Sequence, residues 1–343
     1  MSAARIPLYY HEDYAQITQT PGHPESPDRI KAIMDMITEL EFPADIISPD
    51  PVKPTDLLKI HDDDHVEKIR DFGVGYMDPD TYHHDRTYDM ALRAAGGVVS
   101  AMRHAVRERE AAFSIPRPPG HHAGFNYNMG FCYFNNVALA AKMALEMEDI
   151  SKVAILDVDA HHGNGTNDIF ARDPDILYIS THQWGIFPGT GHQNDVGRGA
   201  GEGKNVNIPL IGGSGDPSLI ECMKEIVVPV TEQFSPDLIL VSIGGDSHIM
   251  DPLTSFTLST PGYLEMMSFI KDLGDKVAGG RIAYELEGGY HPRALAEIFI
   301  GTMAKYLDEL FQFRTRYTET RETMPDNVRI RQIKEVQSQY WKI

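Results

Sequence analysis

The chain has 343 residues, of which 42 % are hydrophobic and 24 % charged, a composition typical of a globular protein with a sizeable core. No apolar run is long enough to span a bilayer and the first residues lack the apolar segment of a signal peptide, so we expect a cytoplasmic protein without a membrane partner. The formal net charge of −19 argues against direct binding of nucleic acid and favours cationic ligands such as lysine-rich peptides or polyamines, although it also fits an acidic surface that only maintains solubility.

Three segments predict helices. The first covers residues 26–40, with Ser26 expected as the N-cap and Pro27 at the first helical position. Its apolar residues repeat at helical spacing and form one face: Ile30, Ile33, Met34, Ile37 and Leu40. The segments 87–110 and 135–150 are rich in alanine and methionine and apolar over much of their circumference, which indicates helices packed tightly on a sheet.

Five short apolar runs between such helices predict buried parallel strands, because their polarity is continuous rather than alternating. They cover residues 111–115, 152–159, 175–180, 237–245 and 281–289. Each run leads into a polar, glycine-containing loop, and the carboxyl ends of parallel strands share the sheet edge where ligands bind. We therefore predict an α/β fold with a mostly parallel sheet flanked by helices on both faces, while the length alone leaves one or two domains open.

The loops at this edge contain a set of metal-binding side chains. Asp159 and His161 are two residues apart in an extended segment, so their side chains point the same way and can share one cation, whereas His162 points elsewhere. Asp246, from another strand, completes three protein ligands with an open position, as in a catalytic zinc site. Each residue alone would more often be a helix cap or a core histidine, but their convergence favours a metal centre.

Adjacent histidines in the loop "GHHAG" fit acid and base chemistry beside such a metal. His121 and His122 need different partners in order to differ in protonation. Asp157 can hold one ring as an imidazolium, and the neutral Asn164 leaves the other freer to act as a base. Tyr290 follows paired glycines, and its hydroxyl could stabilise an oxyanion opposite the metal, although a lone tyrosine is more often a core or rim residue.

Six motifs occur in one order along the chain: "RPPGHHAG", "GFCYFNN", "DVDAHHGNGT", "FPGTG", "GGDSHIMDPL" and "EGGY". Together they resemble the zinc-dependent histone deacetylase and acetylpolyamine amidohydrolase superfamily, and in particular its bacterial and class II members. The resemblance implies a single arginase/deacetylase domain over residues 1–343, with a core at about 5–310 and a polar C-terminal arm at 311–343. This arm could be a terminal extension or a subunit contact, so a homo-oligomer is left open.

The resemblance also implies roles for the catalytic residues. One zinc ion would be held by Asp159, His161 and Asp246, as the spacing argument also proposes. His122 would be the general base and acid, His121 its electrostatic partner held by Asp157, and Tyr290 would polarise the acyl carbonyl.

Further family features map onto this chain by motif position. A potassium ion would be bound through the side chains of Asp157 and Ser180 and through backbone carbonyls that include that of Thr181. The substrate tunnel would have Phe131 and Phe187 as aromatic walls and Gly130 as its floor. Arg29 would line an internal acetate channel, although a salt bridge on the helix surface is a rival interpretation.

Two positions depart from common family patterns. Asn164 stands where many lysine deacetylases have aspartate, so His122 is expected to titrate lower. His248 follows Asp246 by two residues, where arginase relatives have a carboxylate for a second metal ion, but Gly163 lacks the other carboxylate that such a site needs. We therefore expect one metal ion and assign no role to His248. Whether the native metal is Zn²⁺ or Fe²⁺ is left open.

The substrate depends on the residue at the tunnel mouth. Acetylpolyamine-selective members of one branch place glutamate after the "DP" of the fifth motif, whereas this chain has the apolar Leu253, which favours acetyl-lysine in a protein or peptide. The acidic composition keeps small acetylated polyamines as the alternative, and acyl-chain length is left open. A catalytically silent acyl-lysine binding protein would be expected to lack a metal ligand or Tyr290, and all these positions are intact.

Overall fold

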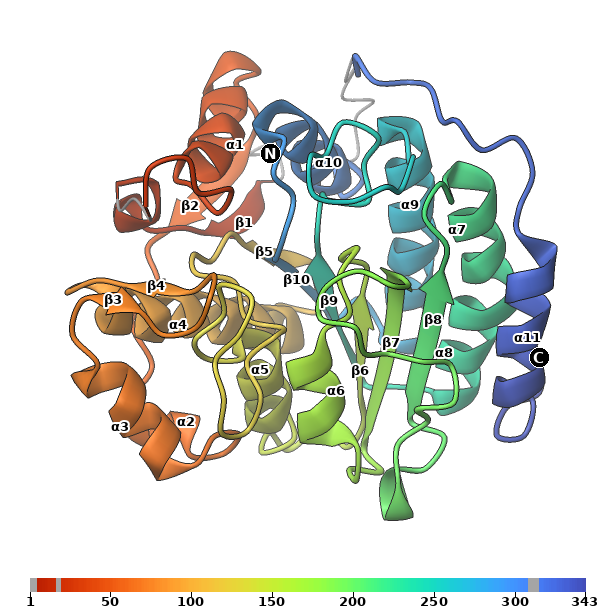
Figure 1. The fold of residues 1–343 in the computed structure, drawn as a ribbon, viewed down its shortest axis with the longest axis horizontal. Coiled ribbons are helices and arrows are strands. Elements are labelled where there is room, and N and C mark those ends of the chain that lie inside the picture. The colour runs from red at the N-terminus through yellow and green to blue at the C-terminus, as the bar shows by residue number, and fades with distance from the viewer. Residues whose placement is uncertain (1–4, 17–19, 308–314) are drawn as a thin grey trace.

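Eight parallel strands form one twisted sheet in the computed structural model, which describes residues 5–16, 20–307 and 315–343 (Figure 1). The strand order is β2-β1-β5-β10-β9-β6-β7-β8, and every neighbouring pair in it is parallel. The strands are β1 (Ile6–Tyr9), β2 (Ala44–Ile47), β5 (Ala112–Ser114), β6 (Val153–Asp157), β7 (Ile176–Gln183), β8 (Asn205–Leu210), β9 (Leu238–Ile243) and β10 (Ile282–Leu286). A separate antiparallel pair is formed by β3 (Gly75–Tyr76) and β4 (Tyr82–His83).

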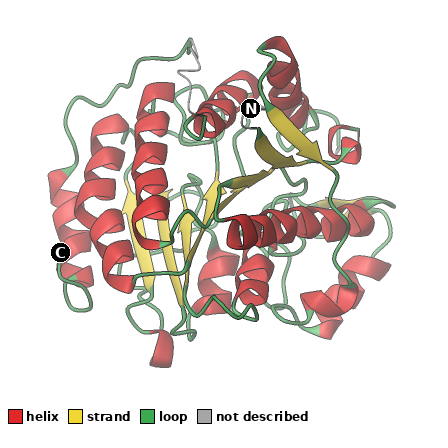
Figure 2. Cartoon of the chain, turned by 180° about the vertical axis from the view of Figure 1, so that it is seen from behind, coloured by secondary structure: helices red, strands yellow, loops and turns green. Residues whose placement is uncertain are grey.

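Helices cover both faces of the large sheet (Figure 2). They are α1 (Asp28–Glu39), α2 (Pro54–Leu57), α3 (Asp63–Asp71), α4 (Thr87–Glu108), α5 (Asn136–Ala144), α6 (Asn164–Phe170), α7 (Asp216–Cys222), α8 (Val228–Phe234), α9 (Thr260–Val277), α10 (Pro292–Ala304) and α11 (Asn327–Gln337). A π-helical turn at Met223–Val227 joins α7 to α8. Short 3-10 turns lie at Glu12–Ala15 and Gly199–Gly201.

The core is divided by the sheet into two layers. Along β6, Ala154 and Leu156 belong to the layer under α1, α7, α9 and α10, while Val153 and Ile155 belong to the layer under α4 and α5. Both sides of this strand are therefore buried, which is why the central strands are continuous apolar runs in the sequence. All five predicted strands and all three predicted helices are confirmed, as is the single α/β domain.

One predicted helix start is wrong. The first helix begins at Asp28, and Pro27 rather than Ser26 is its N-cap residue, without a side-chain cap. The strands β1, β2 and β8 were not predicted. For the edge strand β8 the reason is that its sequence "NVNIPL" alternates asparagine with apolar residues. Asn205 and Asn207 are buried and donate to the side chain of Asn167 in α6, so the polar residues of this strand belong to an internal hydrogen-bond cluster.

The end of the chain differs from the expected polar arm with few apolar anchors. Ile330, Ile333 and Trp341 are buried in the core layer that includes α7 to α10, and the Trp341 Nε1 atom donates to the Gly203 carbonyl at 2.9 Å. The helix α11 thus packs on β8 as part of the domain. Within the described residues no helix has the length and apolar character required to cross a membrane.

Candidate active site

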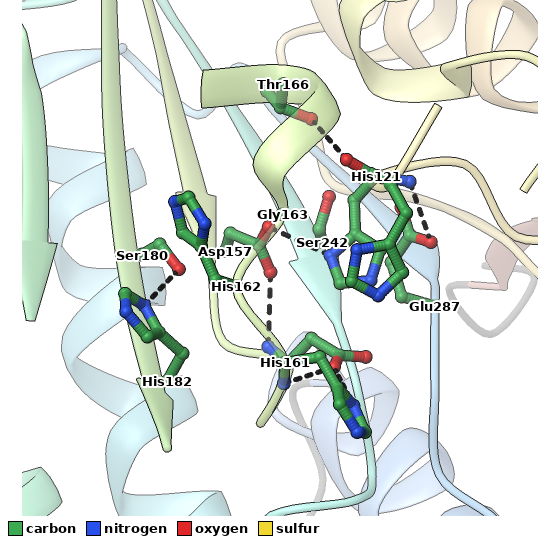
Figure 3. Close-up of polar contacts among 12 residues, drawn as sticks. His121, Asp157, His161, His162, Gly163, Thr166, Ser180, His182, Ser242 and Glu287 are labelled. Atoms are coloured by element: carbon green, nitrogen blue, oxygen red, sulfur yellow. Dashed lines mark hydrogen bonds and ion pairs between the residues drawn. The ribbon is translucent and has the colours of Figure 1, made fainter. Parts of the chain in front are cut away.

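The side chains proposed from the sequence meet at the carboxyl ends of the central strands. Asp157 ends β6 and His161 follows it (Figure 3). Asp159 lies between them in the chain, Asp246 follows β9, and Tyr290 follows β10. The strands β9, β10 and β6 are adjacent in the sheet, so motifs that are far apart in the chain reach one place. Parallel pairing is the physical reason, because it brings all carboxyl ends to one edge.

Three buried side chains form a candidate metal centre. Asp159, His161 and Asp246 each offer one ligand atom, and these atoms lie within 4.8 Å of one another. The His161 Nδ1 atom is 2.7 Å from Asp246 Oδ2 and 3.2 Å from Asp159 Oδ1. Backbone amides hold the carboxylates: Ala160 donates to Asp246 Oδ1 at 2.8 Å and Gly288 donates to Asp159 Oδ2 at 2.7 Å. The ligands are thus oriented by the fold itself.

Two glycines make room for these carboxylates. A Cβ atom on Gly244 would lie 2.2 Å from Asp159 Oδ2, and one on Gly288 would lie 2.7 Å from Asp246 Oδ2. Real side chains essentially never approach so closely, so both positions require glycine. The charges also fit a cation: burial alone lowers the pKa of His161, but Asp159 and Asp246 raise it to about 10. A positive charge is favoured between the two carboxylates, and a divalent ion with nitrogen and oxygen ligands suits this set.

The paired histidines have different partners, as predicted. The His121 Nδ1 atom is 3.1 Å from Asp157 Oδ2, and the His122 Nδ1 atom is 2.7 Å from Asn164 Oδ1. Burial opposes charge on His121, yet Glu287, Asp157 and Asp159 raise its pKa well above the usual value. Burial and the positive charges of His121 and His161 lower the pKa of His122 well below it. Within this pair, whose ring centroids are 4.0 Å apart, the surroundings favour the cationic form of His121 and the neutral form of His122.

Sequence reasoning missed two groups that support His121. The Glu287 Oε2 atom accepts hydrogen bonds from the backbone amides of Gly120 at 2.8 Å and His121 at 3.2 Å (Figure 3). The hydroxyl of Tyr178 on β7 donates to Asp157 Oδ2 at 2.9 Å. Glu287 lies within the "EGGY" motif, and this position could have indicated a role at the site. Tyr178 lies in an apolar strand, where nothing in the sequence distinguishes it from a core residue.

Arg29 is buried rather than at the helix surface. It is 1 % exposed, and it donates to the carbonyl of Gly289 at 2.7 Å and to that of Glu287. Its guanidinium carbon lies 5.1 Å from the centre of the Tyr290 ring, and its Nη1 atom is 3.4 Å from Glu25. The surface salt bridge is therefore excluded, and the arginine holds the glycine pair that precedes Tyr290.

The predicted tunnel residues surround His122 and Tyr290. The ring of Phe187 is 5.1 Å from that of His122, and the ring of Phe131 is 6.1 Å from that of Tyr290. Gly130 has a φ of +56°, and a Cβ atom there would be 2.5 Å from the His122 ring. The glycine therefore lets the backbone approach the imidazole closely.

The loop after β9 reaches the same place. Asp251 accepts the backbone amides of Tyr290 at 2.6 Å and Leu253 at 2.9 Å, and Leu253 is exposed at the surface. This contact ties the loop to the strand end that carries the tyrosine. Burial raises the pKa of Tyr290 well above the usual value, as do the charges of Asp159 and Asp246, so its hydroxyl keeps a proton to donate.

The side chains proposed for potassium lie on adjacent strands. Asp157 and Ser180 face each other in the register of β6 and β7. The Ser180 hydroxyl is 2.9 Å from His182 Nδ1 (Figure 3). Thr181, which was proposed as a ligand through its backbone carbonyl, has a buried hydroxyl without a hydrogen-bond partner among the described residues. Potassium binding stays a prediction.

His248 has a structural environment. Its Nδ1 atom accepts the Met250 amide at 3.1 Å and its Nε2 atom is 3.2 Å from the Thr260 hydroxyl. Its ring lies 5.3 Å from that of Tyr317, in the C-terminal segment. Burial lowers its pKa to about 4, so it is held neutral. The residue therefore connects the loop after Asp246 to α9 and to the end of the chain.

Comparison with known proteins gives a consistent result. A family model described as the histone deacetylase domain matches residues 23–305. A probable deacetylase of Archaeoglobus fulgidus is 38 % identical, with 98 % of each chain covered. A histone deacetylase-like amidohydrolase of Pseudomonas aeruginosa is 37 % identical over 78 % of this chain and 73 % of its own. The crystal structure of the HD domain of HDA15 superposes with a TM-score of 0.87 at 30 % identity, covering 98 % of this chain and 96 % of that one.

Proposed function

Because the chain belongs to the histone deacetylase family, we propose that it is a zinc-dependent hydrolase that removes acetyl groups from lysine side chains of proteins or peptides. The observation that carries this proposal is the buried cluster of Asp159, His161 and Asp246 beside a neutral imidazole. These three residues would hold one zinc ion. When bound, zinc acidifies a water molecule and polarises the amide carbonyl.

The other side chains supply proton transfer and charge stabilisation. His122 binds Asn164 through Nδ1, which leaves its Nε2 atom to take a proton from the attacking water and return it to the leaving amine. His121 carries a positive charge held by Asp157, which lowers the proton affinity of its neighbour. The Tyr290 hydroxyl donates to the oxygen of the acyl group as negative charge develops there.

The mouth of the site favours an acyl-lysine over a polycation. Leu253 offers no charge to a distant ammonium, and its side chain is exposed where the loop after β9 meets the strand end of Tyr290. The rings of Phe131 and Phe187 flank the two catalytic groups and would enclose an aliphatic stem. A potassium ion bound by Asp157, Ser180 and Thr181 would link the carboxyl ends of β6 and β7.

The test is a side-by-side kinetic comparison of zinc-loaded protein on an acetyl-lysine peptide, a longer-acyl peptide, and acetylated putrescine and spermidine. We expect the highest kcat/KM for the acetyl-lysine peptide, and one zinc ion per chain that is lost from Asp246→Ala. A higher kcat/KM for the acetylated amines would instead assign the chain as an acetylpolyamine amidohydrolase. No turnover of any substrate by zinc-loaded or iron-loaded protein would reject both assignments.

A further inference from the structure

Three consecutive hydrogen bonds connect His122 to the protein surface. The His122 Nδ1 atom is 2.7 Å from Asn164 Oδ1, and the Nδ2 atom of the same amide donates to the Tyr127 hydroxyl oxygen at 3.1 Å. That hydroxyl donates to Asp168 Oδ2 at 2.7 Å. Asn164 and Asp168 lie four residues apart in α6, so both side chains share one helix face and can contact one tyrosine.

Asp168, at the surface end of these three hydrogen bonds, determines which group donates in each of them. A carboxylate offers only acceptors, so the proton of Tyr127 must point to Asp168. Burial and the charge of Asp168 raise the pKa of Tyr127, so the hydroxyl keeps that proton. The tyrosine oxygen can then only accept from Asn164, which turns the amide NH₂ outward and the amide oxygen toward His122.

The amide oxygen in turn decides which nitrogen of His122 carries the proton. An oxygen acceptor requires an N–H at Nδ1, so Nε2 has the lone pair that a base needs. The opposite amide orientation would place NH₂ against Nδ1 and favour the tautomer with its proton on Nε2. Asparagine has two chemically different ends, so this position needs orienting groups that an aspartate with two equivalent oxygens would not need.

We propose that Tyr127 and Asp168 are positioning residues that hold His122 in its basic tautomer by fixing the orientation of the Asn164 amide. This inference rests on the proposed role of His122. The other acceptors near the amide nitrogen, the carbonyl of His122 and the sulfur of Met129, are both at the longer distance of 3.4 Å. Tyr127 therefore provides the shortest orienting contact.

The local backbone is built around this tyrosine. The amide of Gly124 donates to the carbonyl of Tyr127 at 3.0 Å, which closes a tight turn. A Cβ atom on Gly124 would lie 2.2 Å from the Tyr127 ring, so the ring occupies the space of the missing side chain. The turn thus places Tyr127 next to Asn164 at the start of α6.

The first test is the kinetics of Tyr127→Phe and Asp168→Ala in the zinc-loaded protein on its best substrate. Tyr127→Phe should lower kcat about five- to tenfold with KM unchanged, since the discrimination of one neutral hydrogen bond is lost. Asp168→Ala should also lower kcat, because the Tyr127 proton then loses its acceptor. The matched control is Tyr340→Phe, which removes another hydrogen bond from tyrosine to a carboxylate, at 3.1 Å to Glu202, outside the site. It should leave kcat unchanged.

A rescue experiment separates orientation from general structural support. In an Asn164→Asp variant the group facing His122 is a carboxylate, and either of its two equivalent oxygens can accept from Nδ1. Adding Tyr127→Phe to this variant should therefore leave its kcat unchanged. If Tyr127→Phe costs the same factor in both backgrounds, the proposal is wrong.

A spectroscopic test does not depend on turnover. Long-range ¹H–¹⁵N spectra of histidine-labelled, zinc-loaded protein, assigned with His122→Gln, should show the proton of His122 on Nδ1. A population protonated on Nε2 should appear in Tyr127→Phe. The same tautomer in both proteins would overturn the inference, whereas absence of deacetylation with the expected tautomer change would count only against the proposed function.

Discussion

Replacement of Gly130 by alanine tests whether His122 must stand where the structure places it. The new Cβ atom would lie 2.5 Å from His122 Cδ2 and 2.9 Å from Phe187 Cε1, whereas ordinary contacts begin at 3.4 Å. The His122 ring would have to move by about 1 Å, and a displacement of that size costs about 100-fold in rate. The φ of +56° adds about 1–2 kcal/mol of backbone strain to the folded state.

The assay compares kcat and bound zinc for Gly130→Ala with those for Gly185→Ala. Gly185 has a φ of +85°, and no atom of the described residues would lie within 4 Å of a Cβ atom added there, so this control carries the backbone strain without the clash. We expect both variants to bind zinc and only Gly130→Ala to lose about two orders of magnitude in kcat. Equal kcat values would show that the ring position near Gly130 does not matter for catalysis.

Three further predictions address the oxyanion, the substrate and acid stability. Tyr290→Phe should lower kcat about 10²- to 10³-fold and keep zinc, and unchanged kinetics would remove the tyrosine from the reaction. Leu253→Glu should shift kcat/KM toward acetylated spermidine relative to an acetyl-lysine peptide; no shift would mean that this residue does not contact substrate. Burial and the charge of His65 lower the pKa of His61 to about 3, so the unfolded chain binds the extra proton below pH 6.5 and stability falls as the pH drops. This histidine alone should cost about 2 kcal/mol of unfolding free energy between pH 7 and pH 5, which urea titrations of wild type against His61→Gln would measure; identical pH slopes would disprove it.

His61 shows why part of the site could not be predicted. It donates through Nδ1 to the carbonyl of Gly124 and accepts the amide of Asn135 at 3.0 Å, so it holds the chain just after His121 and His122 and again just before α5. Nothing near position 61 in the sequence indicates these partners, which are 63 and 74 residues away. Such contacts exist only after the segment between α2 and α3 has packed against the loop that precedes α5.

The C-terminal segment gives a second example. Its charged composition predicts an arm, yet Glu322 accepts the amides of Gly215 at 2.7 Å and Ser218 at 2.9 Å at the start of α7. The ring of Tyr317 contacts those of His248 and His291, which are close in sequence to Asp246 and Tyr290 respectively. A few well-placed anchors suffice for such packing, and composition averages do not reveal them.

The sequence by itself predicted five of the eight parallel strands, the sheet edge at which they end, and the metal-binding and acid–base side chains that meet there. These depend on local periodicity and on one geometric rule of parallel sheets. The tertiary structure alone decided the burial of Arg29, the support of His121 by Glu287, and the contact of Tyr127 with Asn164 and Asp168. Hydrogen-bond partners between distant segments depend on ångström-scale placement after packing, and no pattern along the chain records that placement.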